Sequence, residues 1–433
     1  MEMFYGWRRK LHARFDASSR FKKNFLKVAS ASLFAQALPV LVSPIMTRLY
    51  SPHDYGVLAL FAAILGVAVA IATMRFDWLV AAAHTEKSAA YIEVIGILYL
   101  LLMSLAYFGV SFFGLHHTIA FVDWQIIDPF LWLVPVAVFG SGLHTLFSGW
   151  FVRAAHLTPV ARARVRQSLA VVALGLIGGI YSLGALGLIG ATVLGAFIGV
   201  GGLYRHARND LRRSLANIRA LALCAKARAI RRRVLVSGST GIINVSGLLL
   251  PAIMISHHFS AVELGWYALM YRLATGPVST LTGAVGQSFW GEARSLANSN
   301  PKALQALFER TSSRLMLLSI PVAIACLAGP WYVGLIFGKE EWSGAGEVLA
   351  ALTPFIVAQI IASPLSSVIT IMRHERWLFF WDLARTLVVI AIFSASGHYN
   401  IGLTTAVLSY AIGMAVMYAL LFYKTRRIIV SQG

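Results

Sequence analysis

Long runs of apolar residues, separated by short polar connections, recur along the whole chain. Each run has about 20 residues or more, which is the length of a helix that crosses a hydrocarbon layer of roughly 30 Å. A membrane β-barrel would instead show strands of about ten residues with alternating polarity. The pattern predicts twelve transmembrane helices, at residues 24–48, 55–82, 89–114, 129–152, 168–183, 185–204, 234–257, 264–290, 313–337, 345–372, 378–397 and 400–423.

Two of the polar connections carry related sequences at an offset of 209 residues. YSPHDYGVLAL at 50–60 and FSAVELGWYAL at 259–269 share an aromatic residue, a serine, an acid, a glycine and a final Ala-Leu. Each copy lies early in its half of the chain, so the pattern predicts two lobes of six helices. Because six is an even number, both lobes enter the membrane from the same side. We therefore expect an all-α polytopic fold with a pseudo-two-fold axis along the membrane normal.

The composition and the charge distribution fit a membrane protein with a defined orientation. Of 433 residues, 58% are hydrophobic and 12% are charged, and the mean hydropathy is +0.73. If the N-terminus is cytoplasmic, 32 of the 37 lysines and arginines fall in cytoplasmic segments, as the positive-inside rule requires. This topology explains the net charge of +20 without nucleic-acid binding, which would need a basic face on a soluble domain.

The basic residues also define the expected domain boundaries. Residues 1–23 predict a basic amphipathic segment on the cytoplasmic surface, and residues 205–233 predict a basic cytoplasmic linker that rests on anionic lipids. The remaining residues form an N-lobe at 24–204 and a C-lobe at 234–433, which ends in a short cytoplasmic tail. Both termini are thereby expected in the cytoplasm.

No catalytic, cofactor or metal-binding motif is expected. The two cysteines lie in different segments, so no disulfide framework is indicated. His116-His117 and His257-His258 fall in exterior connections with no carboxylate at ligand spacing, so no metal site is predicted. These connections are also too short to fold as a catalytic domain.

Charged and amide side chains inside the predicted helices are the candidate substrate-binding groups. A charge near the bilayer centre costs about 2.5 to 3.5 kcal/mol on insertion scales, so it usually faces a partner or a watery cavity. Arg272 is expected about 12 Å inside its span, at a rise of 1.5 Å per residue, which is too deep for a loop arginine. The candidates for a cavity between the lobes are Arg272, Arg75, Arg385, Gln36 and Gln287.

Each candidate also has a structural alternative. Arg272 could form a buried ion pair, and Arg75 could reach the cytoplasmic interface from the end of its helix. Arg385 lies three residues after Asp382, a spacing at which an ion pair stabilises a helix surface. The glutamines could form interhelical hydrogen bonds. Arginines that face a cleft would suit an anionic cargo, particularly a phosphate or pyrophosphate, because a guanidinium offers paired donors.

A family resemblance rests on four segments of the chain. They are SPIMTRLYSPHDYGVLALF, TMRFDWLVAA, GWYALMYRLATGPVSTLTGAVGQSFWGEA and GPWYVGLIFGKEEWSGAGEVLAALTPFIVAQIIASPLSSV. In their order and spacing, the chain resembles the O-antigen and polysaccharide flippases of the multidrug, oligosaccharidyl-lipid and polysaccharide exporter superfamily. The resemblance implies a two-lobed protein of a bacterial inner membrane. Such a protein flips a polyprenyl-pyrophosphate-linked repeat unit of O-antigen, capsule or exopolysaccharide to the periplasmic leaflet by alternating access. Arg75 and Arg272 then look like counterparts of cavity arginines on the second and eighth helices of the related lipid II flippases.

The resemblance also implies partners, and two other functions stay open. The implied partners are the lipid-linked oligosaccharide and anionic membrane lipids, with a polysaccharide polymerase and glycosyltransferases as further candidates. No cofactor is expected, since the chain has no phosphate-binding loop. The open alternatives are a cation-coupled multidrug exporter of the same superfamily and a membrane enzyme of polysaccharide assembly. A drug-cation exporter would need acids in its cavity, and a polymerase is expected to have a large exterior loop.

Overall fold

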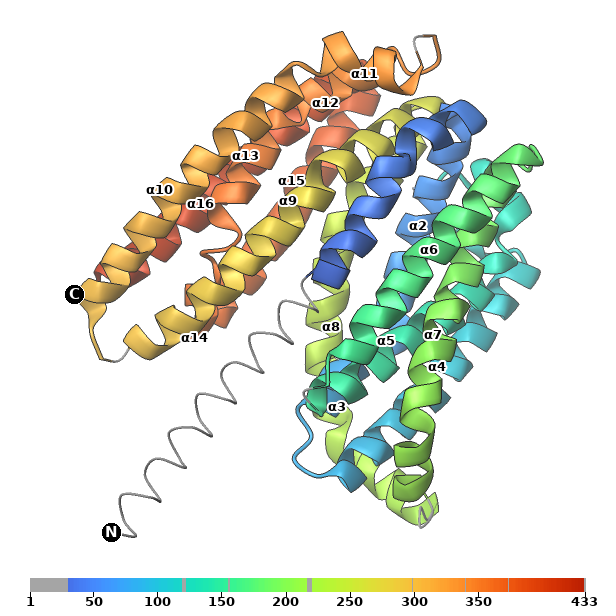
Figure 1. The fold of residues 1–433 in the computed structure, drawn as a ribbon, viewed down its shortest axis with the longest axis vertical. Helices are drawn as coiled ribbons and strands as arrows, with labels where there is room; N and C mark the ends of the chain where they lie inside the picture. The colour runs from blue at the N-terminus through green and yellow to red at the C-terminus, as the bar shows by residue number, and fades with distance from the viewer. Residues whose placement is uncertain are drawn as a thin grey trace, which may run out of the picture.

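The computed structural model describes residues 30–118, 122–154, 156–215, 220–297, 299–338, 340–372 and 374–431 (Figure 1). The regular elements in these residues are all helices. The amphipathic segment expected at residues 1–23 lies outside the described residues.

The described part of the chain contains twelve helical spans, six in each half, and one of them is divided into α13 and α14. Eleven of them are long and apolar enough to span a membrane, and the twelfth, α9, is long but more polar. The N-lobe contains Ser30–Leu49, α2 (Pro52–Thr73), the short α3 (Phe76–Ala81), α4 (Glu86–Phe112), α5 (Leu133–Arg153), α6 (Thr158–Ile180) and α7 (Ala185–Leu215). The C-lobe contains α8 (Ala220–His258), α9 (Ala261–Leu296), α10 (Pro301–Leu327), α13 (Thr353–Ala362), α14 (Ser367–Ile371), α15 (Glu375–His398) and α16 (Leu403–Val430). The prediction of an all-α protein with twelve membrane helices is confirmed.

Corresponding helices of the two lobes pack in the same way. In the N-lobe α7 packs against α5 and α6, and in the C-lobe α16 packs against α13 and α15. By chain order, Ser30–Leu49 corresponds to α8, α2 to α9 and α4 to α10. The same order in both halves is that of a parallel repeat about an axis along the membrane normal.

The two copies of the repeated sequence begin α2 and α9 in the same way. Ser51 and Ser260 are the N-caps, and each side chain accepts a hydrogen bond from the backbone N–H of the acid three residues later. In return, the carboxylates of Asp54 and Glu263 accept hydrogen bonds from the backbone N–H groups of the serines, at 3.0 and 2.9 Å. These capping boxes satisfy backbone donors that the first turn of a helix leaves free, which explains the shared serine and acid.

The shared glycine lets α2 and α9 touch through their backbones. A Cβ atom at Gly56 would overlap the carbonyl oxygen of Ala261, and one at Gly265 would overlap that of Pro52. Pro52 and Ala261 lie 209 residues apart, and so do Gly56 and Gly265, which is the offset of the sequence repeat. The crossing is therefore symmetric, and only glycine lets the two backbones approach so closely. We call these four residues the glycine crossing.

The ninth and tenth predicted spans are broken at prolines. The expected helix at 313–337 ends as α10 at Leu327, and α11 (Gly329–Phe337) forms a separate helix with Pro330 in its first turn (Figure 1). The expected helix at 345–372 is divided into α12 (Ala345–Ala351), α13 and α14. Pro354 lies in the first turn of α13, and Pro364 lies between α13 and α14. Proline favours the start of a helix and interrupts its interior, so these boundaries follow from its missing N–H.

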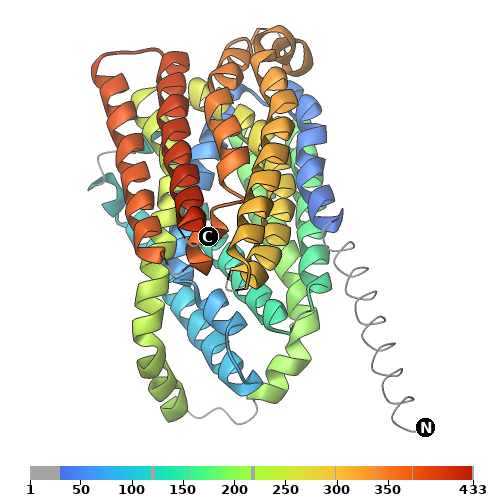
Figure 2. The same cartoon turned by 90° about the vertical axis from the view of Figure 1, so that its left-hand side faces the viewer.

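The basic linker expected at 205–233 is not a separate element in the described residues. α7 continues to Leu215, and α8 begins at Ala220. The end of α7 and the beginning of α8 lie together at one end of the molecule (Figure 2). On the α8 extension, Lys226 Nζ donates a hydrogen bond to Ser88 Oγ of α4 at 2.7 Å. The basic residues thus lie on continuations of membrane helices.

Replacing the glycine at the crossing should destabilise the protein. In Gly265→Ala, the new methyl group meets a backbone carbonyl that cannot rotate away, so we expect a loss of about 1 to 3 kcal/mol, the usual cost of overpacking. Gly276→Ala in the same helix is the matched control, because a Cβ there meets nothing within 4 Å. The measurement is the thermal unfolding midpoint of each purified variant. Equal midpoints for the two variants would show that the crossing tolerates a side chain.

Candidate functional site

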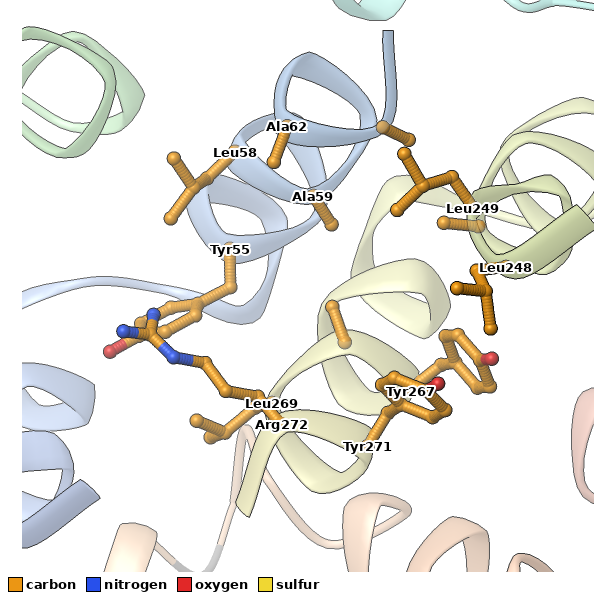
Figure 3. Close-up of a pocket in the computed structure, with 13 residues that line it drawn as sticks. Tyr55, Leu58, Ala59, Ala62, Leu248, Leu249, Tyr267, Leu269, Tyr271 and Arg272 are labelled. Atoms are coloured by element: carbon orange, nitrogen blue, oxygen red, sulfur yellow. The ribbon is translucent and has the colours of Figure 1, made fainter. Parts of the chain in front are cut away.

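A cavity of about 190 Å³ lies between α2 of the N-lobe and α8 and α9 of the C-lobe (Figure 3). We call it the interlobe cavity. Alanines and leucines form most of its wall, and Tyr55, Tyr267, Tyr271 and Arg272 add polar atoms. Among these lining residues only Arg272 is charged. The cavity adjoins the glycine crossing, since the lining residue Tyr55 precedes Gly56 on α2 and the lining residue Tyr267 follows Gly265 on α9.

Arg272 provides an unpaired positive charge at the boundary between the lobes. At 1.5 Å per residue it lies about 17 Å from the first residue of α9. It is exposed and lines the interlobe cavity. Figure 3 shows that it extends from α9 toward Tyr55 of α2. No carboxylate among the described residues forms an ion pair with it, so its charge is available to a ligand.

Arg75 is a second arginine at the lobe boundary, located where α2 ends and α3 begins. Its guanidinium carbon is 5.8 Å from the ring centre of Trp78, and the ion pairs of the described residues do not include it. Its side chain passes beside Gly241 of α8, where a Cβ would lie 2.8 Å from the Arg75 Nε. At 1.5 Å per residue, Arg75 lies about 35 Å along α2 whereas Arg272 lies about 17 Å along α9. The two arginines are therefore too far apart to bind one phosphate together.

Arg385 lies in a different environment from the other two arginines. Its exposed fraction is 3%, and its Nη2 is 3.0 Å from Asp382 Oδ1. Its guanidinium carbon also lies 5.1 Å from the ring centre of Trp381, and Gly247 of α8 leaves room for the side chain. Arg385 does not line the cavities of about 190, 650 and 610 Å³ in the described residues. Arg385 therefore forms the local ion pair with Asp382 that was the structural alternative to a cavity role.

Gln287 lines a larger cavity, of about 650 Å³, between α9, α13 and α14. We call it the C-lobe cavity. Its polar side chains are hydroxyls and amides: Ser279, Thr282, Gln287, Gln359, Ser363, Ser366, Ser367 and Thr370. Such groups can both donate and accept hydrogen bonds. A neutral wall of this kind suits sugar hydroxyls better than it suits an ion.

Gln36 connects Ser30–Leu49 to α9. Its Oε1 accepts a hydrogen bond from Thr280 Oγ1 at 2.8 Å. This contact joins the first helix of the N-lobe to a helix of the C-lobe. Gln36 therefore forms an interhelical hydrogen bond, the structural alternative expected for the glutamines. The side chain remains exposed, so it borders the space between the lobes.

The N-lobe contains a cavity that the sequence analysis did not predict. It has a volume of about 610 Å³ between α3, α5 and α6, and its charged or titratable lining residues are Asp77, His144 and Arg164. Glu93 of α4 is fully buried and close enough to Asp77 for their charges to interact. Neither carboxylate oxygen of Glu93 has a hydrogen-bond partner among the described residues. The available signal was a single acid in the apolar run 89–114.

Comparison with known proteins gives a family and a fold. A family model described as "Polysaccharide biosynthesis protein" matches residues 45–346, whereas no curated protein sequence matches the chain. Among solved structures, an inward-facing multidrug resistance MATE family transporter of the MOP superfamily is 15% identical, with a TM-score of 0.69 over 93% of this chain and 95% of that one. The lipid II flippase MurJ in an inward closed conformation is 11% identical, with a TM-score of 0.69 over 94% and 89%. An outward-facing MATE transporter is 14% identical, with a TM-score of 0.56 over 95% and 96%.

The position of Arg272 can be tested by thiol labelling. In a background with Cys224 and Cys326 replaced, Arg272→Cys should react with a small polar thiol reagent in the folded protein. Met270→Cys is the matched control, because Met270 lies on the same helix and has an exposed fraction of 0%. Mass spectrometry of the native protein measures the labelled fraction. Labelling of both positions, or of neither, would contradict an accessible cavity at Arg272.

Proposed function

Because the chain belongs to the polysaccharide biosynthesis protein family and has the fold of MOP-superfamily transporters, we propose that it flips a polyprenyl-pyrophosphate-linked oligosaccharide. The substrate moves from the cytoplasmic to the periplasmic leaflet of a bacterial inner membrane. The observation that carries this proposal is the unpaired Arg272 at the interlobe cavity. A pyrophosphate accepts the paired donors of a guanidinium, whereas a cationic cargo would be repelled by it.

The distribution of basic residues supports an orientation with the glycine crossing at the periplasmic side. The ribbons of the two lobes meet near this end and diverge toward the other end (Figure 1). In this orientation the ribbons of the two lobes diverge toward the cytoplasm.

The three parts of the substrate meet different parts of the protein in this proposal. Arg75 lies nearer the cytoplasmic end and contacts the pyrophosphate first, and Arg272 contacts it deeper in the membrane. The C-lobe cavity replaces the hydrogen bonds that sugar hydroxyls lose when they leave water, which would otherwise prevent their passage through hydrocarbon. The polyprenyl chain stays in the lipid, where it needs no polar partner.

The membrane potential favours export of the pyrophosphate group. The cytoplasm is negative, so each negative charge that moves outward gains about 2.3 kcal/mol per 100 mV. The substrate can therefore move down its electrical gradient without nucleotide hydrolysis.

A cation-coupled multidrug exporter is the second candidate, and the acids of the N-lobe favour it. Asp77 lines the N-lobe cavity and Glu93 lies buried beside it, and acids within a membrane can bind protons or cations. Deleting the gene distinguishes the candidates. Loss of surface polysaccharide with unchanged drug sensitivity supports the flippase, and the reverse result supports the exporter.

Arg272→Ala should abolish most transport. Losing a hydrogen bond to a charged group costs about 1.5 to 3 kcal/mol, so we expect a fall of about tenfold to a hundredfold in surface polysaccharide. Arg272→Lys should retain more activity, because it keeps the charge but not the paired donors. The assay is complementation of a deletion strain, with immunoblotting of membranes to show equal amounts of protein.

Arg294→Ala is the matched control for this experiment. It removes the same charge from α9 at an exposed position near the end of the helix. This variant should produce a normal amount of polysaccharide. A normal amount in Arg272→Ala would exclude Arg272 from substrate binding.

A further inference from the structure

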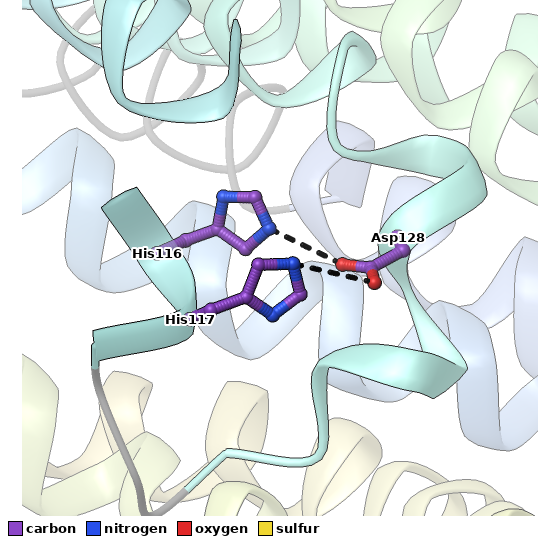
Figure 4. A group of neighbouring side chains, drawn as sticks. All are labelled: His116, His117 and Asp128. Atoms are coloured by element: carbon purple, nitrogen blue, oxygen red, sulfur yellow. Dashed lines mark hydrogen bonds and ion pairs between the residues drawn. The ribbon is translucent and has the colours of Figure 1, made fainter. Parts of the chain in front are cut away.

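The connection between α4 and α5 brings two histidines and an aspartate together (Figure 4). His116 and His117 lie in a short 3₁₀ helix, η1 (Leu115–Thr118), and Asp128 begins another, η3 (Asp128–Phe130). One ligand atom from each of the three side chains lies within 4.8 Å of the other two. We propose that these residues bind a divalent transition-metal ion of the zinc type. The sequence has no carboxylate at ligand spacing beside these histidines, and the fold brings Asp128 to them from twelve residues along the chain.

The distances between the histidine nitrogens and the carboxylate oxygens are close to those between neighbouring ligand atoms of a zinc ion. The Nε2 atom of His116 is 3.3 Å from Asp128 Oδ1, and that of His117 is 3.7 Å from Asp128 Oδ2. Charge-assisted hydrogen bonds between nitrogen and carboxylate oxygen are shorter, about 2.7 to 2.9 Å. Zinc binds histidine nitrogen and carboxylate oxygen at about 2.0 to 2.2 Å in tetrahedral geometry, which places neighbouring ligand atoms roughly 3.3 to 3.6 Å apart.

His116 is held in the orientation that metal binding requires. It is 8% exposed, and its Nδ1 lies 3.4 Å from the carbonyl oxygen of Val110 at the end of α4. Donation from Nδ1–H to this carbonyl leaves the Nε2 lone pair directed at Asp128, which is the arrangement that second-shell partners impose on metal-binding histidines. The ring of Trp124 packs edge-on against His116 at 5.1 Å between centroids. The ring centroids of His116 and His117 are only 4.1 Å apart, so both Nε2 atoms turn to the same carboxylate (Figure 4).

The ligand set selects the class of metal. Two imidazoles and one carboxylate favour zinc, nickel or copper over magnesium and calcium, which prefer oxygen ligands alone. The side chains of His117 and Asp128 are 56% and 38% exposed, which gives an ion a path from solvent and leaves a position for water. A bound ion would join η1 to η3 and so fix the connection between α4 and α5.

Metal binding can be measured on the full-length protein, purified with an affinity tag that contains no histidines and so binds no zinc. After removal of metals with a chelator, titration calorimetry with Zn²⁺ should show one site per chain, and saturating Zn²⁺ should raise the thermal unfolding midpoint. Asp128→Asn and His117→Gln should each weaken Zn²⁺ binding by at least about tenfold, as loss of a metal ligand or its orienting partner does. His117 is exposed, so its variant should fold normally.

His257→Ala is the matched control. His257 and His258 are also adjacent, with ring centroids 4.7 Å apart, but they belong to no group of metal-binding side chains in the described residues. This variant should bind Zn²⁺ as the wild type does. Absence of binding in the wild type, or equal affinity in wild type, Asp128→Asn and His117→Gln, would overturn the proposal and leave only hydrogen bonds at this position. Loss of binding in His257→Ala would place the metal elsewhere.

Discussion

The contact between α2 and α9 at the glycine crossing is the constraint on which the rest of the structure depends. Because Gly56 and Gly265 have no side chain, each helix rests on a backbone carbonyl of the other. The capping boxes begin both helices at equivalent residues, so the contact is symmetric about the axis that relates the lobes. With the lobes joined at this end, any opening between them develops toward the opposite end. The interlobe cavity begins directly beside this contact.

The distribution of polar groups follows from that arrangement. α9 borders the space between the lobes, so it can carry Arg272 and a series of hydroxyl and amide groups that would be costly against lipid. Arg385 is at a comparable disadvantage in the membrane, but its cost is offset by Asp382 and by the ring of Trp381. Arg272, which has no ion-pair partner among the described residues, therefore borders the interlobe space, whereas the paired Arg385 lies in packed protein. The same reasoning draws attention to Glu93, which is buried without a hydrogen-bond partner among the described residues.

Hydropathy was sufficient to predict the number of helices, because a bilayer imposes span length on the sequence itself, and the repeated segments at 50–60 and 259–269 predicted the two lobes. The sequence did separate Arg385 from Arg272, because Asp382 lies three residues before Arg385 on the same helix and pairs with it, but only the fold shows that no carboxylate of a neighbouring helix reaches Arg272 among the described residues. Asp128 was missed for a similar reason: its distance from His116 along the chain gives no local spacing, and the fold of the connection brings them together. The breaks in the ninth and tenth spans coincide with Pro330, Pro354 and Pro364, but prolines alone could not place them, since Pro251, Pro277 and Pro321 lie inside continuous helices.

If transport requires the lobes to separate at the glycine crossing, joining them there must stop it. Tyr55 of the N-lobe and Trp342 of the C-lobe already touch across this end, with ring centroids 5.3 Å apart. Tyr55 and Trp342 can be changed to cysteine in a background without Cys224 and Cys326 and linked by a short, cleavable thiol reagent. Transport of the lipid-linked oligosaccharide in proteoliposomes should fall to background when the link is present and return when it is cleaved. Transport at the wild-type rate with the link intact would contradict an alternating opening at this end.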